Sequence, residues 1–226
     1  MGVWNQDAVF NQVPPAGGAV STFIGTKGTN SSTTSYSQSF LGNTIPPGLI
    51  VVVVHNEGGG GVTPTSVSIG GQAAAMAVES NSALASEHVS IWYGVTTASS
   101  LSVSVVYSSA PVRSGVGVYK IENYTSSTPY LTGTDDDGGT ATASLSVETE
   151  RRLNRGYVII AGATSGDEYA HTWSGVTEDY DEQVAGGLTG QTGASIQTTS
   201  AQKYTINSTT DGTPNQGTCL AIAAWG

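Results

Sequence analysis

The run GLIVVVVH, from Gly48 to His55, is matched later in the chain by GYVIIAGA, from Gly156 to Ala163. Each run begins with a glycine and is then mostly apolar, which predicts a central β-strand covered on both faces. The patterns around the first run, from Tyr36 to Glu122, return in the same order between Thr140 and Trp225. The chain is therefore predicted to contain an internal duplication, with about six strands in each half.

Polar and apolar residues alternate through most of the remaining chain. The segment TATASLSV places Ala141, Ala143, Leu145 and Val147 on one face, and the segment 101–107 alternates in the same way. Such strands bury one face and expose the other, and turn residues recur about every ten positions. No segment shows the periodicity and caps of a helix. The predicted fold class is all-β, an antiparallel β-sandwich with a jelly-roll-like arrangement.

One Pro/Gly-rich break, VPPAGG, sets the predicted domain organisation. Residues 1–18 are predicted to be an N-terminal arm, whose Trp4 and Phe10 contact a capsid or a sister subunit. Residues 19–226 are predicted to form a single β-sandwich domain, with pseudo-repeat halves at about 33–122 and 140–226. We expect the halves to complete each other's sheets, while two tandem domains remain the alternative. The arm or a partner is the expected cover for the two apolar runs.

Composition and charge limit the classes of partner. The chain has 226 residues and a net charge of −10, and only seven residues are lysine or arginine. So few basic residues cannot follow a phosphate backbone, so nucleic acid is not an expected partner. No apolar stretch is long enough to span a bilayer, and the N-terminus lacks a signal-peptide pattern. The single cysteine, Cys219, is expected to be a small buried hydrophobe.

Asp135, Asp136 and Asp137 form the densest charge cluster. Three carboxylates in one turn are a candidate Ca²⁺ site, because calcium takes about six to eight oxygen ligands. Their spacing does not match the EF-hand pattern, in which the ligands alternate along the loop. A solvated turn is the preferred interpretation, so no metal and no cofactor is predicted.

Tyr180 stands within a second acidic segment, which also holds Glu178, Asp179, Asp181 and Glu182. Paired carboxylates can hydrolyse glycosides. The preferred interpretation is an acidic edge strand that blocks aggregation between sheets.

The chain contains three histidines, His55, His88 and His171. They lack the spacing of zinc ligands, and no Gly-x-Ser-x-Gly elbow accompanies them. They are therefore expected at strand ends. The glycines at 58–61 follow an apolar strand without the Lys-Ser/Thr of a phosphate loop, so they are expected at a loop tip. No catalytic residue is predicted.

Four aromatic residues are candidates for a sugar-binding platform: Trp92, Tyr93, Trp173 and Tyr180. Packing inside the sheets is the alternative, because aromatic residues are favoured in strands. The only basic cluster consists of Arg151, Arg152 and Arg155. It is expected to pair with nearby glutamates or to contact an acidic surface.

Several strand sequences resemble a group of β-sandwich proteins from tailed bacteriophages and prophages. They are VVVVHNEGG (51–59), TSVSIGG (65–71), VSIWYGVTT (89–97), LSVSVVYSS (101–109), GVGVYKI (115–121) and TWSGVTEDYDEQV (172–184). The resemblance covers roughly residues 35–226 and lies in framework strands. It implies a role in the virion, as a capsid decoration protein, head fibre or other appendage, and it supplies no catalytic motif.

The expected function is therefore that of a non-enzymatic structural virion protein. We expect it to decorate and cement the head shell by binding the major capsid protein, as a homo-oligomer, dimer or trimer, made in the host cytoplasm. A receptor- or carbohydrate-binding fibre module is the alternative, and the aromatic residues would distinguish it.

Overall fold

The computed structural model describes residues 17–40, 48–58, 62–84, 86–97, 100–138, 140, 142–166, 170–184 and 189–226. Over these ranges the chain forms β-strands β1 to β17, and all pairs between them are antiparallel. The predicted all-β, antiparallel fold is confirmed. Trp4 and Phe10 of the predicted arm lie outside the described residues.

The first half of the chain builds two sheets. Inner sheet 1 has the order β1 (Val20–Thr29), β9 (Arg113–Glu122), β3 (Gly48–Glu57), β7 (Glu87–Thr96) and β6 (Ala75–Asn81). Outer sheet 1 has the order β2 (Ser35–Phe40), β8 (Leu101–Tyr107), β4 (Pro64–Ile69) and β5 (Gln72–Ala73). Gly70 and Gly71 join β4 to β5 with positive φ angles, as a tight hairpin turn requires.

The second half builds two sheets in the same way. Inner sheet 2 has the order β10 (Leu131–Asp136), β17 (Thr218–Trp225), β12 (Val158–Gly166), β15 (Thr189–Gln197) and β14 (Thr177–Gln183). Outer sheet 2 has the order β11 (Ser144–Glu148), β16 (Thr205–Thr210) and β13 (His171–Ser174).

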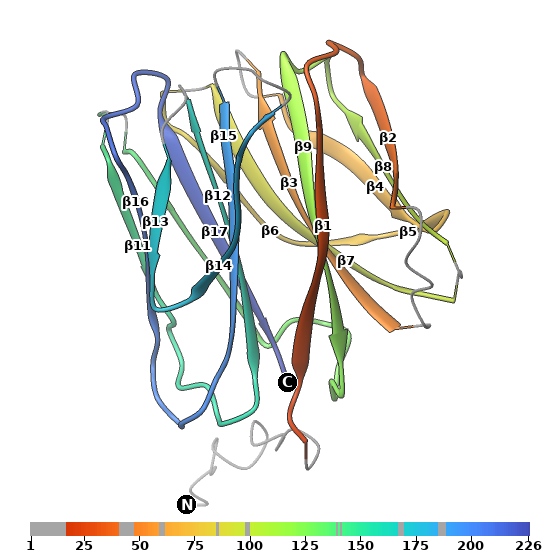
Figure 1. Ribbon diagram of the computed structural model, residues 1–226, viewed down its shortest axis with the longest axis vertical. Helices are drawn as coiled ribbons and strands as arrows, with labels where there is room; N and C mark the ends of the chain where they lie inside the picture. The colour runs from red at the N-terminus through yellow and green to blue at the C-terminus, as the bar shows by residue number, and fades with distance from the viewer. Residues whose placement is uncertain are drawn as a thin grey trace, which may run out of the picture.

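The four sheets stack as four layers, with the inner sheets in the middle (Figure 1). Three hydrophobic cores fill the spaces between them. The first core joins outer sheet 1 to inner sheet 1, and the third joins inner sheet 2 to outer sheet 2. The second core lies between the two inner sheets, where Val51 and Val53 of β3 meet Val158 and Ile160 of β12. Each half is thus a sandwich, and the two sandwiches pack face to face.

This central packing explains the two apolar runs. Every residue of β12 is buried, and so is β3 apart from Gly48. Each strand presents one face to its own outer sheet and the other face to the opposite half. The cover on the second face is therefore the other half of the chain.

One expectation is wrong. The halves do not complete each other's sheets, because each of the four described sheets takes its strands from one half only. Each half already has its own edge strands, so the halves meet through faces instead. Tyr130 and Leu131, at the joint between the halves, pack against the third core.

The strand orders of the two inner sheets correspond position by position, and the outer sheets correspond except that outer sheet 1 has the additional short strand β5. The β-bulge in β6 lies between Met76 and Val78, and Met76 pairs with Trp92 of β7. The bulge in β14 follows Glu178, which pairs with Ala194 of β15 in the same way. A β-bulge is a specific feature of a fold, because it inserts one extra residue at one position of a strand. The matching positions of the two bulges therefore support the predicted duplication. The duplication and the jelly-roll-like connectivity stay predictions.

Candidate functional site

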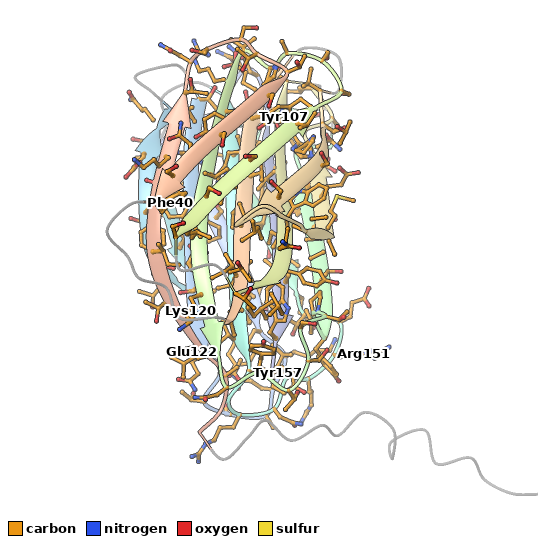
Figure 2. All side chains as sticks on the ribbon, turned by 90° about the vertical axis from the view of Figure 1, so that its right-hand side faces the viewer. Phe40, Tyr107, Lys120, Glu122, Arg151 and Tyr157 are labelled. Atoms are coloured by element: carbon orange, nitrogen blue, oxygen red, sulfur yellow. The ribbon has the colours of Figure 1, made fainter. Side chains whose placement is uncertain are left out.

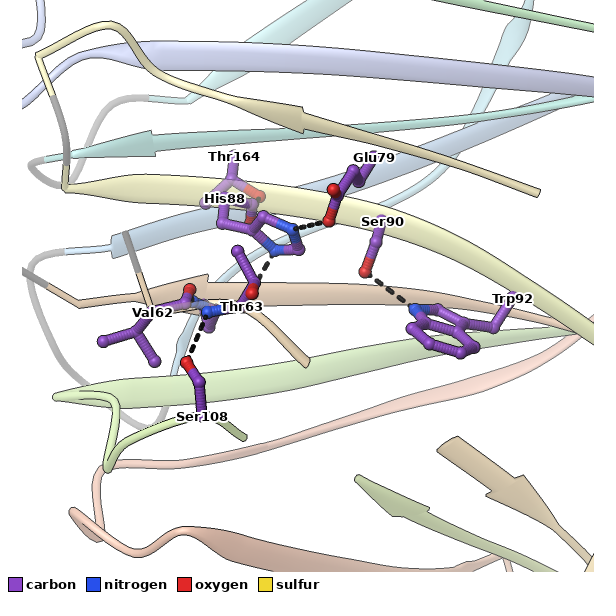
Figure 3. A network of polar contacts seen from close by, with 9 residues as sticks. Val62, Thr63, Glu79, His88, Ser90, Trp92, Ser108 and Thr164 are labelled. Atoms are coloured by element: carbon purple, nitrogen blue, oxygen red, sulfur yellow. Dashed lines mark hydrogen bonds and ion pairs between the residues drawn. The ribbon is translucent and has the colours of Figure 1, made fainter. Parts of the chain in front are cut away.

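His88 is at the centre of a polar network at one end of inner sheet 1 (Figure 3). Its Nδ1 lies 3.0 Å from Asn56 Oδ1, and its Nε2 lies 3.4 Å from Glu79 Oε2. Asn56 donates a hydrogen bond from Nδ2 to the Val62 carbonyl at 2.9 Å, which turns its oxygen toward the histidine. The hydrogen bond with His88 lowers the pKa of Glu79.

A pocket of about 230 Å³ adjoins this network, and its lining includes Gly58, Val62, Thr63, Ser82, Glu87 and His88. Both ring nitrogens of His88 are engaged, Nδ1 with the Asn56 amide oxygen and Nε2 with the Glu79 carboxylate. Neither nitrogen is left to take a proton from a serine or threonine hydroxyl. The pocket is therefore not equipped for nucleophilic catalysis by a histidine-activated hydroxyl.

His55 joins the two halves of the molecule. Its side chain points from β3 toward inner sheet 2, with Nδ1 2.8 Å from Thr164 Oγ1 and Nε2 2.8 Å from Tyr180 Oη. Burial, together with smaller contributions from the nearby His171 and His88, lowers the pKa of His55 to about 3. The ring is therefore neutral at physiological pH. It positions the two sheets and is closed to substrates.

His171 plays a similar part inside the second sandwich. Its Nδ1 lies 2.8 Å from Ser208 Oγ, and its Nε2 lies 2.9 Å from Ser165 Oγ. Burial lowers the pKa of His171 to about 4. This serine–histidine contact is buried, so it does not present a nucleophile to a substrate. The expected histidine positions are confirmed in part, because all three lie in strands but all three are buried.

The polar contacts between the inner sheets were missed at the sequence level. Glu57 of β3 accepts hydrogen bonds from Arg113 and, at 2.6 Å, from Thr189 Oγ1 of the other half. Gly115 and Gly117 of β9 make room for Gln191 and Tyr180, because a Cβ at either glycine would collide with those side chains. Glycines at alternating positions of one strand are the sequence signal by which this close approach could have been found.

The three aspartates are not brought together. Asp135 Oδ2 accepts from the Ser146 amide at 2.7 Å, and Asp136 Oδ1 accepts from the Gly138 amide at 2.7 Å. Asp137 is buried and accepts from Ser82 Oγ at 2.6 Å and from two backbone amides, those of Ala83 and Thr218.

The first half contributes Ser82 and Ala83 to Asp137, and the second half contributes Thr218, so this carboxylate ties the halves together. The interpretation of all three aspartates as a solvated turn is therefore wrong for Asp137. Over the described part of the chain, no group of three or more His, Cys, Asp or Glu side chains is placed to hold a metal ion.

The four aromatic residues do not form a shared platform. Trp92 is buried in the first core, Tyr93 and Tyr180 belong to the second, and Trp173 packs against the third. Trp92 and Trp173 also use their indole N–H groups inside the protein, on Ser90 and Thr192. The sugar platform is therefore corrected to core packing, because consecutive strand residues point to opposite faces.

The acidic segment around Tyr180 is strand β14, which lies at the edge of inner sheet 2 as expected. Its bulge and its carboxylates make it a poor partner for another strand. Glu182 faces β1, where Thr26 Oγ1 donates to it at 2.6 Å. Burial raises the pKa of Asp181 to about 6, and of Asp179 above its ordinary value.

The basic cluster is exposed at Arg151, Arg152 and Arg155. Glu148 pairs with Lys203 at 2.8 Å. Cys219 is buried as expected, and burial raises the pKa of its thiol. Of the four-glycine run, only Gly58 lies within the described residues.

Comparison with known proteins adds no family. No protein-family model matches the chain, and no curated protein matches it. Within the described residues, no helix is long and apolar enough to cross a membrane.

Proposed function

We propose that this chain is a non-catalytic structural protein of a tailed-phage particle, a decoration protein that binds the head shell. The resemblance of its strands to phage β-sandwich proteins supports a location in the phage particle. The histidine contacts support a structural role without catalysis, since each of the three histidines has both ring nitrogens engaged in contacts within the protein.

The outer sheets supply the surfaces for such a role. The strands of outer sheet 1 contain no charged residue, and those of outer sheet 2 contain only one carboxylate, that of Glu148. Their solvent faces carry mainly serine and threonine, such as Ser37, Ser104, Thr172 and Thr209. A chain of net charge −10 repels acidic partners, so its uncharged faces are where another protein can approach closely.

The proposed mechanism is physical. A rigid body that binds only the assembled shell favours the assembled state by linkage, by an amount that depends on its concentration relative to Kd. The partner is the major capsid protein, and the place is the head surface. The aromatic platform on which a carbohydrate-binding role would depend lies in three separate cores, so that role is not proposed.

Electron cryomicroscopy of particles produced with and without the chain tests the proposal. We expect ordered density at regular sites on the capsid lattice, present only when the chain is made. Density confined to a tail or fibre, or no density on any part of the particle, would contradict the decoration role. Thermal release of the genome at the same temperature from both kinds of particle would contradict the stabilising role.

A further inference from the structure

The edges of the four sheets differ in how well they resist the addition of another strand. Edge strands are normally protected by bulges, charges or shortness. In the described part of the chain, β1, β6 and β14 each contain a bulge, and β5 and β13 have two and four residues. β10 and β11 carry the carboxylates Asp135, Asp136 and Glu148.

Strand β2 has none of these protections. It is six residues long, SYSQSF, with no charge and with an unbroken register against β8. Among the described residues it pairs with β8 alone, and it forms one edge of outer sheet 1 (Figure 2). Its solvent-facing residues Ser35, Ser37 and Ser39 are exposed.

The equivalent edge in the second half is protected. Strand β11 holds the position of β2 there, and its Ser146 amide donates to the Asp135 carboxylate of β10 at 2.7 Å. In the first half, Lys27 of β1 takes the place of Asp135. Gly25 of β1 pairs with β9 at the position where Gly133 of β10 pairs with β17, and Lys27 and Asp135 each follow two residues after that glycine. A lysine ammonium only donates hydrogen bonds, so it cannot protect a backbone amide in this way.

Charge favours a second copy of the chain as the partner at this edge. Two copies, each with a net charge of −10, repel one another wherever their carboxylates meet. Outer sheet 1 avoids this repulsion, because its four strands contain no charged residue.

The sequence of β2 is also complementary to itself. An antiparallel pair centred on Gln38 would set Tyr36 opposite Phe40 of the second copy and Ser37 opposite Ser39 of the second copy. Residues that are directly opposite share a face. The buried aromatic residues would therefore stay on the core side and the serines on the solvent side.

We propose that two copies of this chain pair through β2, antiparallel and about a two-fold axis at Gln38. The pairing joins the two outer sheets 1 into one continuous sheet and makes an isologous dimer, the commonest symmetric assembly. It occurs in the free protein, whether or not a phage particle is present.

Disulfide trapping tests the geometry. In the variant Gln38→Cys the two thiols face each other across the axis, with Cα atoms about 4.5–5.5 Å apart, within reach of a disulfide. Cys219 is buried, so mild oxidation acts on the new cysteine. We expect a covalent dimer of Gln38→Cys on a denaturing gel, and no covalent dimer for the control Ser102→Cys on the neighbouring strand β8. Equal crosslinking of both variants, or of neither, would overturn the proposal.

Mass measurement tests the energetics. The chain weighs 23.0 kDa, so sedimentation equilibrium of the whole protein should give twice that mass. Gln38→Lys places two ammonium groups opposite each other and should raise the dimer Kd at least about tenfold.

Ser102→Lys is the charge control, since it changes the net charge by the same amount and should leave the dimer intact. It lies beside Ser39 on the solvent face, whereas Gln38 shares the face of Tyr36 and Phe40. Both variants make the net charge of the chain less negative by one. If only Gln38→Lys weakens the dimer, the effect therefore comes from its position on the edge strand β2 and not from the change in net charge. Circular dichroism melts establish that both variants fold. A wild-type monomer at tens of micromolar, or an unchanged dimer of folded Gln38→Lys, would show that β2 does not pair.

Discussion

His55 and His171 make the stability of this protein sensitive to acid. Burial lowers the pKa values of the two side chains to about 3 and about 4, from ordinary values near 6.5. Below pH 6.5 the unfolded chain takes up protons that the folded chain does not bind. Their stabilisation is therefore complete above pH 6.5 and falls as the pH drops toward the folded-state pKa values, by about 1.4 kcal/mol per pH unit for each histidine.

Asp181 opposes part of this loss, because its folded-state pKa of about 6 means that the folded protein binds its proton first. We expect the free energy of unfolding, measured with urea, to fall between pH 6.5 and pH 4.5. The variant His55→Gln should have a smaller pH slope over that range. An identical slope in the variant would show that His55 is not buried in its neutral form.

Asp137 is the carboxylate whose removal should matter most among the three aspartates. Asp137→Ala leaves Ser82 Oγ and the amides of Ala83 and Thr218 without this acceptor, so it should cost about 3 kcal/mol or more. For a chain of this size that is a fall in Tm of roughly 6–12 °C. The exposed Asp136→Ala is the control and should change Tm by no more than about 2 °C. Equal effects would place Asp137 outside the joint between the halves.

At the scale of elements, the closeness of β9 to the opposite sheet depends on glycine. A Cβ at Gly117 would collide with the Tyr180 ring, whereas a Cβ at Gly94 of β7 meets only ordinary contacts from 3.6 Å outward. We expect Gly117→Ala to destabilise the protein by about 1–3 kcal/mol through overpacking. Gly94→Ala should be neutral or slightly stabilising, because glycine weakens a strand interior. Urea unfolding of the two variants measures the difference, and equal stabilities would mean that the inner sheets are farther apart.

At the scale of the whole molecule, the second core makes the halves depend on each other. Leu49, Val51 and Val53 of one half and Ile160 and Trp225 of the other are fully buried only because the inner sheets meet. We expect residues 17–124 and 125–226 to aggregate when each is expressed alone, since each exposes a broad apolar face. Expressed together, they should form a soluble complex.

Calorimetry of the intact chain should accordingly show one cooperative transition. Two soluble half-chains, each with its own sharp transition, would instead establish two independent domains. The polar contacts of His55 and Asp137 across the same interface add specificity to its apolar packing.

What the sequence determined by itself is the kind of element and the number of its faces that are buried. Alternation in segments such as 101–107 predicts strands with one wet face, and the run at 48–55 predicts a strand with none, because both patterns are local. The acidic edge strand and the buried Cys219 follow from the same local logic.

Only the tertiary structure decided which face meets which. Trp92 and Tyr93 are adjacent in sequence, yet they enter different cores, because successive strand residues point to opposite faces. The partners of His55 and Asp137 lie in the other half of the chain, more than fifty residues away. No local pattern encodes such distant contacts. They arise when the two apolar faces find each other, where the glycines of β9 allow the sheets to come close enough for polar groups to bond.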